Sequence, residues 1–592
     1  MGFKMIKERL EKLRSLMGEY NIAVYMLTSR DYNLSPYVSD YFKSREYMSG
    51  FTGSNGTLVV TRDEAVLYTD SRYYIQAEDQ LNGSGIVLYR EDEKETTPII
   101  EYIVNHVESK ERVGFDGRTV SASFALNLKK ELVKKQAELV CDIDLVSLMW
   151  EGRPSMPSGK AFLHSLEYAG EKSESKIKRL REALKEKGAD IHLISTLDDI
   201  AYLLNIRGSD VHSLPVVLSY LIVTQNELVV FMDSEKLDEE GRAYLESLNA
   251  QILPYDSVYT YLSNYDGECM SMLLDTKKVN YRLCNEAQKR FAVTDDKNPT
   301  EYFKAVKNEV EVKNAKRARI KDGKAVCEFL ADLKKNISKG NITEITASQK
   351  LWEYRKAQGA FSVSFDTICA YEAHGAIVHY VADEKTDAQI KDAGLLLIDS
   401  GGQYKEGTTD VTRTVVMGKL TSFQKKCYTL VLKGMLAVAF QEFEEGTLGN
   451  VFDEIARKPL NEHGLDYGHS TGHGVGSFLS VHEGPNGFSK RNDVEVAEGM
   501  ITTDEPGVYL EGEFGVRIEN ELLCIRKANG LLGFEFLTMV PIDKEAIDFE
   551  LMTSEDIQRL NHYHKIVREN ILPIINDEAR EYLLYATDEI KI

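Results

Sequence analysis

A twelve-residue segment near the N-terminus returns without gaps later in the chain, and this duplication constrains the fold more than any other feature. Val59–Asp70 (VVTRDEAVLYTD) aligns with Ile222–Asp233 (IVTQNELVVFMD). Each copy has the pattern of a strand, a polar turn and a second strand, and each follows another apolar strand candidate. The duplication predicts two related α/β domains in tandem.

Two stretches mark the boundaries of these domains. Glu151–Gly159 (EGRPSMPSG) is rich in Pro, Gly and Ser and has no apolar period, which is typical of a linker. Asn308 begins an Asn-x-x-Glu capping box that leads into a long charged helix. We therefore predict an N-terminal α/β domain (1–158), a second, related α/β domain (159–305) and a C-terminal domain (306–592).

Charge and hydropathy disfavour nucleic acid and membranes as partners. The net charge of −22 disfavours binding to nucleic acid or to anionic membrane surfaces. Apolar runs stay below the roughly 18–20 residues that a transmembrane helix needs. The first residues, Met1–Glu8, have the pattern of an amphipathic helix and lack the apolar segment of a signal peptide. The expected location is the cytoplasm.

Two aspartates in the C-terminal third follow or open strands. Gly394–Ile398 is an apolar segment that ends in Asp399, and a glycine-rich turn follows it. The segment 408–416 then has the pattern of a second, β-branched strand and carries Asp410. A hairpin of this kind can bring Asp399 and Asp410 together although eleven positions separate them.

Three more candidates lie downstream. His473 belongs to HSTGHGVG (469–476), whose glycines disfavour a helix and favour a loop that presses its backbone close to another segment. Glu505 opens a turn. Strand alternation over 516–520 puts Arg517 and Glu519 on one face and Ile518 on the other.

Four carboxylates and one imidazole therefore share one region of the sequence. Any one of them alone would be read as a solvated or structural side chain. Hard oxygen ligands with a single histidine suit Mn²⁺, and also Co²⁺ or Zn²⁺. Five protein ligands are too many for one catalytic metal with an open position, and they suit two metals about 3.5–4 Å apart that share a hydroxide.

At these positions the sequence resembles the pita-bread dinuclear metallopeptidases, and most closely the cytosolic three-domain Xaa-Pro aminopeptidases (aminopeptidase P). The resemblance covers nearly the whole chain. Its five-ligand pattern matches Asp399, Asp410, His473, Glu505 and Glu519. Supporting segments are REYMSGFTGS (45–54), YTDSRYY (68–74), LLNIRGSD (203–210), GAIVHY (375–380), HGVGSFL (473–479) and VHEGP (481–485).

The resemblance implies two creatinase-N-like α/β domains followed by a pita-bread catalytic domain. It also implies that Asp399 chelates one metal, that His473 and Glu505 hold the other, and that Asp410 and Glu519 bridge both. Glu505 would carry a proton as well.

Other side chains match positions in the family that surround the ligands. His379, His469 and His482 match its substrate-binding and transition-state histidines. Tyr509 and Arg517 match residues that support the ligand shell.

The implied activity is release of the N-terminal residue from peptides with proline at the second position, by attack of a dimetal-bound hydroxide on the Xaa-Pro amide. The expected metal is Mn²⁺, with Co²⁺ or Zn²⁺ as alternatives, and the expected assembly is a homodimer. Two departures from the family pattern are Val508, which stands where an aromatic residue usually follows the glycine, and Ala382, which replaces the proline of His-Tyr-x-Pro.

Two alternative functions are open. A prolidase-type Xaa-Pro dipeptidase uses the same five ligands, but enzymes of that kind typically carry one N-terminal domain. A non-catalytic, peptide-binding pita-bread protein is disfavoured because all five ligand positions are present.

Overall fold

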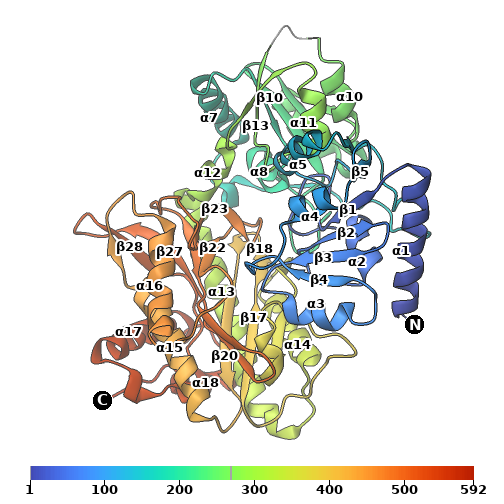
Figure 1. Cartoon of the computed structure of the whole chain (residues 1–592). Coiled ribbons are helices and arrows are strands. Elements are labelled where there is room, and N and C mark those ends of the chain that lie inside the picture. The colour runs from blue at the N-terminus through green and yellow to red at the C-terminus, as the bar shows by residue number, and fades with distance from the viewer. Residues whose placement is uncertain (1, 267–269, 592) are drawn as a thin grey trace. The chain divides into compact units, whose positions relative to one another are not determined.

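The computed structural model describes residues 2–266 and 270–591. The chain forms two compact units (Figure 1). One comprises residues 1–164 and 171–300, and the other comprises residues 165–170 and 301–592. The short helix α6 (Leu166–Ala169) therefore belongs to the second unit, although the chain before residue 165 and the stretch from 171 to 300 belong to the first. The predicted domain boundaries at 158 and 305 stay a prediction.

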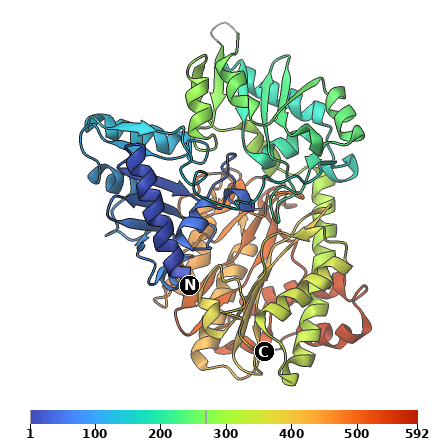
Figure 2. The same ribbon diagram turned by 90° about the vertical axis from the view of Figure 1, so that its right-hand side faces the viewer.

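The first unit begins with a six-stranded sheet in the order β4-β3-β2-β1-β5-β6. Helix α1 (Gly2–Glu19) covers one face with the apolar residues of its inner side, and lies in front of the strands in Figure 2. The strands are β1 (Val24–Thr28), β2 (Thr57–Thr61), β3 (Ala65–Thr69), β4 (Val87–Arg90), β5 (Arg112–Gly114) and β6 (Glu138–Val140). The other helices are α2 (Ser44–Ser49), α3 (Tyr74–Leu81), α4 (Ile99–Asn105) and α5 (Ala122–Lys134).

A second sheet of the same topology follows, in the order β12-β11-β10-β8-β13-β14. Its strands are β8 (Ile191–Ile194), β10 (Ser219–Thr224), β11 (Leu228–Met232), β12 (Ala250–Leu253), β13 (Ser271–Leu274) and β14 (Ala292–Asp295). The strands β7 (Phe162–Leu163) and β9 (Ile206–Arg207), which precede and follow β8 in the sequence, form a separate two-stranded sheet. The helices are α7 (Ser173–Glu186), α8 (Leu197–Leu204), α9 (Glu239–Ser247), α10 (Ser257–Ser263) and α11 (Tyr281–Ala287).

The two sheets confirm the duplication predicted from sequence. In each, a central strand pairs antiparallel with the next strand of the same sheet and parallel with a later one (β1 with β2 and β5; β8 with β10 and β13). The repeated twelve-residue segment forms the antiparallel hairpin β2–β3 in one sheet and β10–β11 in the other.

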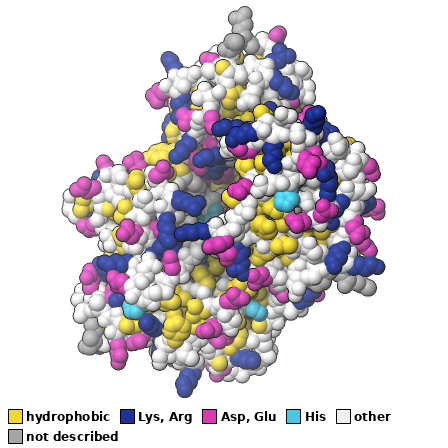
Figure 3. Space-filling view, in the orientation of Figure 1, with side chains coloured by type: hydrophobic (Ala, Val, Ile, Leu, Met, Phe, Trp, Pro, Cys, Tyr) yellow, Lys and Arg dark blue, Asp and Glu magenta, His cyan; other side chains and the backbone are white. Residues whose placement is uncertain are grey.

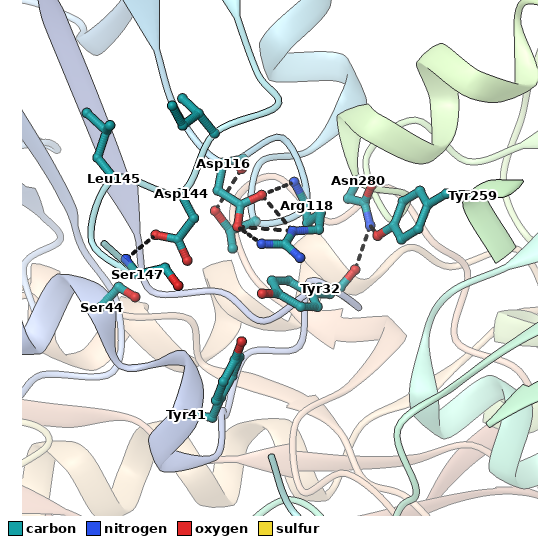
Figure 4. A network of polar contacts seen from close by, with 12 residues as sticks. Tyr32, Tyr41, Ser44, Asp116, Arg118, Asp144, Leu145, Ser147, Tyr259 and Asn280 are labelled. Atoms are coloured by element: carbon teal, nitrogen blue, oxygen red, sulfur yellow. Dashed lines mark hydrogen bonds and ion pairs between the residues drawn. The ribbon is translucent and has the colours of Figure 1, made fainter. Parts of the chain in front are cut away.

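Polar contacts join the two N-terminal sheets within their unit (Figure 4). The Asn280 amide donates to the backbone carbonyl of Tyr32 at 2.7 Å and to the hydroxyl of Tyr259 at 3.4 Å. The Arg118 guanidinium forms a two-pronged ion pair with Asp116 and lies 4.1 Å from the centre of the Tyr32 ring. Of these contacts, the bond from Asn280 to Tyr32 crosses between the two domains, and a buried hydrogen bond of this kind helps to specify how they pack.

The second unit is built around helix α13 (Glu309–Asn336), 28 residues long. The Asn308 side chain accepts from the backbone N–H of Glu311, and the Glu311 carboxylate accepts from the N–H of Asn308, which confirms the predicted capping box. Besides α6, the other helices are α12 (Pro299–Ala305), whose first two residues still belong to the first unit, α14 (Glu344–Ala357), α15 (Ser422–Ala439), α16 (Gly449–Asn461), α17 (Ser554–Ile571) and α18 (Asp577–Ala586). Helices α15 and α16 lie side by side in Figure 1, and their buried residues belong to a hydrophobic core that they share with β27 (Asn520–Arg526), β28 (Leu532–Phe536) and α17.

Two sheets of this unit carry the candidate site. One has the order β16-β17-β20 and the other the order β21-β28-β27-β24-β22-β23. Their strands are β16 (Ile368–Tyr371), β17 (Leu395–Ser400), β20 (Val411–Val416), β21 (Glu442–Phe443), β22 (Gly472–Gly474), β23 (Glu483–Phe488), β24 (Ile501–Asp504), β27 (Asn520–Arg526) and β28 (Leu532–Phe536). Two smaller sheets contain β15 (Ser362–Val363), β18 (Gly402–Tyr404) and β19 (Gly407–Thr408), and β25 (Gly507–Leu510) and β26 (Phe514–Arg517).

The surface shows no single patch of acidic charge on the face drawn in Figure 3, where Asp and Glu are interspersed with Lys and Arg. Among the helices of the described residues, none combines the length and the apolar character that crossing a bilayer requires.

Candidate metal centre

Asp399 and Asp410 stand at neighbouring strand ends. β17 and β20 pair antiparallel, so that Asp399 near the end of β17 lies opposite Thr412. The strand predicted over 408–416 begins at 411, and Asp410 stands immediately before it. The expected glycine turn is instead a small hairpin, β18–β19, where Gly401 approaches Thr409 so closely that a Cβ would lie 1.8 Å from the Thr409 carbonyl oxygen.

His473 lies at the centre of β22, between β24 and β23. The predicted close approach of backbone is confirmed, since a Cβ on Gly472 would lie 1.8 Å from the Thr503 carbonyl oxygen. The prediction of a loop was wrong. The glycines form a strand because, without side chains, their backbone can lie close to the backbones of both neighbouring strands, β23 and β24. A register shift between His473 and Gly474 bends the strand at the imidazole.

The geometry of His473 suits a metal ligand. Its Nδ1 lies 2.9 Å from the Gly474 carbonyl oxygen, which can only accept, so Nδ1 carries a proton. The Nε2 atom points at carboxylates, 3.2 Å from Glu505 Oε1 and 3.6 Å from Asp410 Oδ2. In a neutral ring this atom presents its lone pair to those oxygens, an arrangement that a cation between them would satisfy.

Glu505 and Glu519 are held by backbone and threonine hydroxyls. Glu505 follows β24, accepts from the Thr503 hydroxyl at 3.1 Å and donates its N–H to the Thr471 carbonyl at 2.7 Å. Glu519 precedes β27, and its Oε2 accepts from the Thr412 hydroxyl at 2.8 Å. One atom each of Asp410, His473 and Glu519 lies within 4.8 Å of the others.

The acidic residues are buried close enough to oppose one another's ionisation. Burial, followed by the charges of Asp399 and Glu505, raises the pKa of Asp410 well above its usual range. Burial and then Asp410 raise the pKa of Glu519 in the same way. Without a metal, burial favours the protonated form of Glu505, but the hydrogen bond and the charge of a protonated His473 ring, with further positive charge from Arg517, together outweigh burial and lower the pKa of Glu505 to about 2.

Two unpartnered oxygens support a cation at this place. Within the described residues, Asp399 Oδ1 and Asp410 Oδ1 are buried and have no hydrogen-bond partner. A buried carboxylate oxygen without a donor is costly, and a divalent cation relieves both this cost and the repulsion between the carboxylates. The donor set of four carboxylates and one imidazole therefore fits hard or borderline divalent metals.

A chain of hydrogen bonds runs from the acidic cluster to His469. Arg517, 1% exposed, donates to Asp399 Oδ2 at 2.6 Å and to the Tyr509 hydroxyl at 2.8 Å. The Tyr509 hydroxyl lies 2.7 Å from His469 Nε2, and His469 Nδ1 lies 2.7 Å from the Ser470 carbonyl oxygen. Burial lowers the pKa of His469 to about 4, so at neutral pH Nδ1–H donates and Nε2 accepts from Tyr509.

The structure places the other predicted side chains as follows. The exposed His482 ring packs edge-on against His473 with 4.2 Å between centroids. Half-buried His379 lies next to Val378, whose carbonyl accepts from Arg517 at 3.3 Å. Ile518 faces the hydrophobic core, as the alternation predicted.

The sequence reasoning missed the two threonines, Thr412 and Thr503. A signal was present, since Thr412 stands two residues after Asp410 and Thr503 two residues before Glu505. The period of two places Thr412 on the same face as Asp410 and Thr503 on the same face as Glu505. The Thr503 hydroxyl bonds to Glu505, whereas the Thr412 hydroxyl bonds to Glu519 on another segment.

Comparison with known proteins identifies the parts of the chain. The model described as Metallopeptidase family M24 matches residues 313–526, and the C-terminal region of that peptidase matches 530–590. Two models of the Creatinase/Prolidase N-terminal domain match residues 9–146 and 152–311. They confirm the predicted fold class of two creatinase-N-like α/β domains before a pita-bread catalytic domain.

Curated relatives match over nearly their full length. The chain is 38% identical to Xaa-Pro aminopeptidase 1 of Dictyostelium discoideum, covering 97% of this chain and 94% of the relative. It is 36% identical to Aminopeptidase P2 of Arabidopsis thaliana, covering 98% and 88%.

Solved structures include a relative that matches the whole chain and shorter relatives that match part of it. An X-prolyl aminopeptidase of Caenorhabditis elegans, described as a cytosolic enzyme with a di-nuclear active site, covers 99% of this chain and 100% of its own, with a TM-score of 0.95 and 33% identity. The Xaa-Pro dipeptidase of Bacillus anthracis, at 25% identity and a TM-score of 0.51, covers 63% of this chain and 99% of its own.

Proposed function

The chain belongs to metallopeptidase family M24, among the Xaa-Pro aminopeptidases, and from this premise we propose that it releases the N-terminal residue from peptides whose second residue is proline. The observation that carries the proposal is the buried cluster of four carboxylates around the His473 imidazole. It occurs in a chain that matches three-domain aminopeptidases from end to end.

Five side chains would hold two divalent cations, for which we propose Mn²⁺, with Co²⁺ or Zn²⁺ as alternatives. Asp399 would hold one cation, His473 and Glu505 the other, and Asp410 and Glu519 both. When bound, such cations act as Lewis acids that lower the pKa of a water and polarise a carbonyl.

Glu505 is the proposed proton carrier. Its carboxylate lies beside the other proposed ligands, 3.2 Å from His473 Nε2, and in its ionised form it can accept a proton from the attacking water. The water oxygen forms the new bond to the carbonyl carbon, the C–N bond to proline breaks, and the proton passes from Glu505 to the proline nitrogen. The proposed leaving group is thus a neutral secondary amine.

Three histidines are proposed to bind and orient the peptide. His379 and His482 would donate hydrogen bonds to the scissile carbonyl, or to the next one along, as negative charge develops. His469 is neutral at working pH, and the Tyr509–Arg517 chain holds its ring in one tautomer. Tyr509 and Arg517 thereby couple this ring to Asp399.

The Xaa-Pro bond explains why a dedicated enzyme is needed. It is a tertiary amide without an N–H, and its proline φ is fixed. A peptidase that binds its substrate as an extended strand loses a hydrogen bond at that position.

For the setting of the enzyme, we propose the cytoplasm, supported by the likeness to a Caenorhabditis elegans enzyme described as cytosolic. The homodimer expected from the family stays a prediction, which light scattering tests.

The test compares Arg-Pro-Pro with Arg-Pro, with Mn²⁺ before and after chelation. We expect cleavage of the tripeptide to need metal, and E505Q and H473N to lose nearly all turnover while E511Q, an exposed control, keeps it. Cleavage of the dipeptide alone would favour a prolidase. A folded wild type with neither bound metal nor cleavage would favour a peptide-binding protein.

A further inference from the structure

A buried glutamate outside the candidate metal centre gathers four hydrogen bonds. Glu344, the first residue of α14, is fully buried. Its carboxylate accepts from the backbone N–H of Tyr371 at 2.7 Å and of Ala388 at 3.0 Å. It also accepts from His374 Nδ1 at 2.8 Å and from the Tyr380 hydroxyl at 2.8 Å. A buried carboxylate of this kind holds its donor groups in position, because leaving any of these donors without a hydrogen bond would cost free energy.

The segment that Glu344 holds carries His379. Two consecutive backbone turns run from His374 to Tyr380, and these two rings stack with 4.5 Å between their centroids. On one side of His379, the Val378 carbonyl accepts from Arg517, which also bonds to a predicted metal ligand. On the other side, Tyr380 is held by Glu344. His379 therefore lies between two anchored neighbours.

The start of this segment is fixed to the strands of the site. Glu372 has a left-handed φ of 51°, and its carboxylate accepts from the N–H of Leu395, the first residue of β17, at 2.6 Å. Gly375 lies so close to β26 that a Cβ on Gly515 would lie 1.7 Å from the Gly375 carbonyl oxygen. The left-handed backbone of Glu372, a residue other than glycine, persists only where the surrounding structure holds it.

The end of the segment differs from the family pattern. Ala382 stands where the family pattern has proline, so its φ is not fixed by a ring, and Val381 is 52% exposed. Among the hydrogen bonds described above, the one from the Tyr380 hydroxyl to Glu344 is the side-chain contact that immediately precedes Val381 and Ala382 in the sequence.

We propose that Glu344 is a positioning residue for peptide cleavage, which holds the His379 imidazole in place through Tyr380 and His374. This rests on the proposed function, since it assigns His379 to the substrate. Glutamine at position 344 would turn an NH₂ group toward the four donors, so at least one hydrogen bond is lost and the segment shifts. A misplacement of about 1 Å in a catalytic group costs on the order of 100-fold in rate.

The test uses the full-length, metal-loaded enzyme and an Xaa-Pro-Xaa tripeptide. The variants are E344Q, the milder Y380F, and the control E353Q, whose carboxylate lies on the exposed side of the same helix. We expect E344Q to lower kcat/KM by about 10- to 100-fold and Y380F by less, while bound metal per chain stays as in wild type. E353Q should match wild type.

Each variant is then made in an H379A background. If Glu344 acts through His379, E344Q lowers the residual kcat/KM of H379A by less than about twofold, because the positioned group is already gone. A loss that multiplies fully with that of H379A, or a loss that tracks lost metal, would overturn the proposal. Should E344Q not fold, Y380F decides by the same criterion. Absence of cleavage by metal-loaded wild type would instead sink the proposed function.

Discussion

Replacing Asp410 by Asn should have opposite effects on the metal-free and the metal-loaded protein. In the metal-free protein, oxygens of Asp410 and Glu519 lie within 4.8 Å of each other. At that separation and an effective dielectric constant of 20, two unit charges repel by about 3.5 kcal/mol. Because 4.8 Å is the upper limit of that separation while proton uptake by the cluster relieves part of the repulsion, D410N should stabilise the metal-free protein by on the order of 3 kcal/mol at neutral pH.

The metal-loaded protein should respond in the other direction. A cation at 1,000 times its Kd stabilises the fold by about 4 kcal/mol, and D410N removes a ligand and forfeits part of this gain. The cost of charge in the cluster is absent below the ordinary carboxyl pKa of about 4, grows as pH rises from there toward the raised pKa of Asp410, and levels off above it. The stabilisation of metal-free D410N should therefore shrink on acidification.

The assay is urea unfolding of wild type, D410N and the control D392N, whose carboxylate is exposed, after chelation and after reloading with Mn²⁺. D392N should behave as wild type in both states. Equal destabilisation of D410N with and without metal would refute the reasoning, because it would mean that Asp410 is held by ordinary hydrogen bonds.

Two more predictions concern buried charge elsewhere. Burial raises the pKa of Asp31 from 3.8 to about 6, so its ionisation at pH 7 costs the folded state up to about 3 kcal/mol. D31N should recover this free energy in denaturant unfolding, and the gain should disappear below about pH 4. A gain in stability that does not depend on pH would contradict an origin in the charge of Asp31. Arg355, fully buried, pairs with Asp322 at 2.8 and 3.0 Å. R355M should cost about 3–5 kcal/mol by stranding a buried carboxylate, while the neighbouring surface control K356M should cost about 0.5 kcal/mol or less; equal losses would contradict the importance of that pair.

The fold could be predicted from sequence where the signal was local. The repeated segment 59–70 and 222–233 predicted a duplicated hairpin, and both copies form one in sheets of the same strand order. The capping box at Asn308 predicted the start of α13, because its two hydrogen bonds join residues three apart.

Other features depend on contacts between distant segments. The strand character of β22 needs the backbones of β23 and β24 on either side, and glycine propensity alone favoured a loop. Glu344 has its partners at positions 371, 374, 380 and 388, and no spacing rule links a helix start to a turn so far along the chain.

The most direct test of the two-metal account is anomalous diffraction from crystals of the Mn²⁺-loaded enzyme, recorded at the manganese edge. We predict two peaks about 3.5–4 Å apart, one beside Asp399, the other beside His473 and Glu505, and both within coordination distance of Asp410 and Glu519. A single peak, or a pair bound away from these five side chains, would contradict the account.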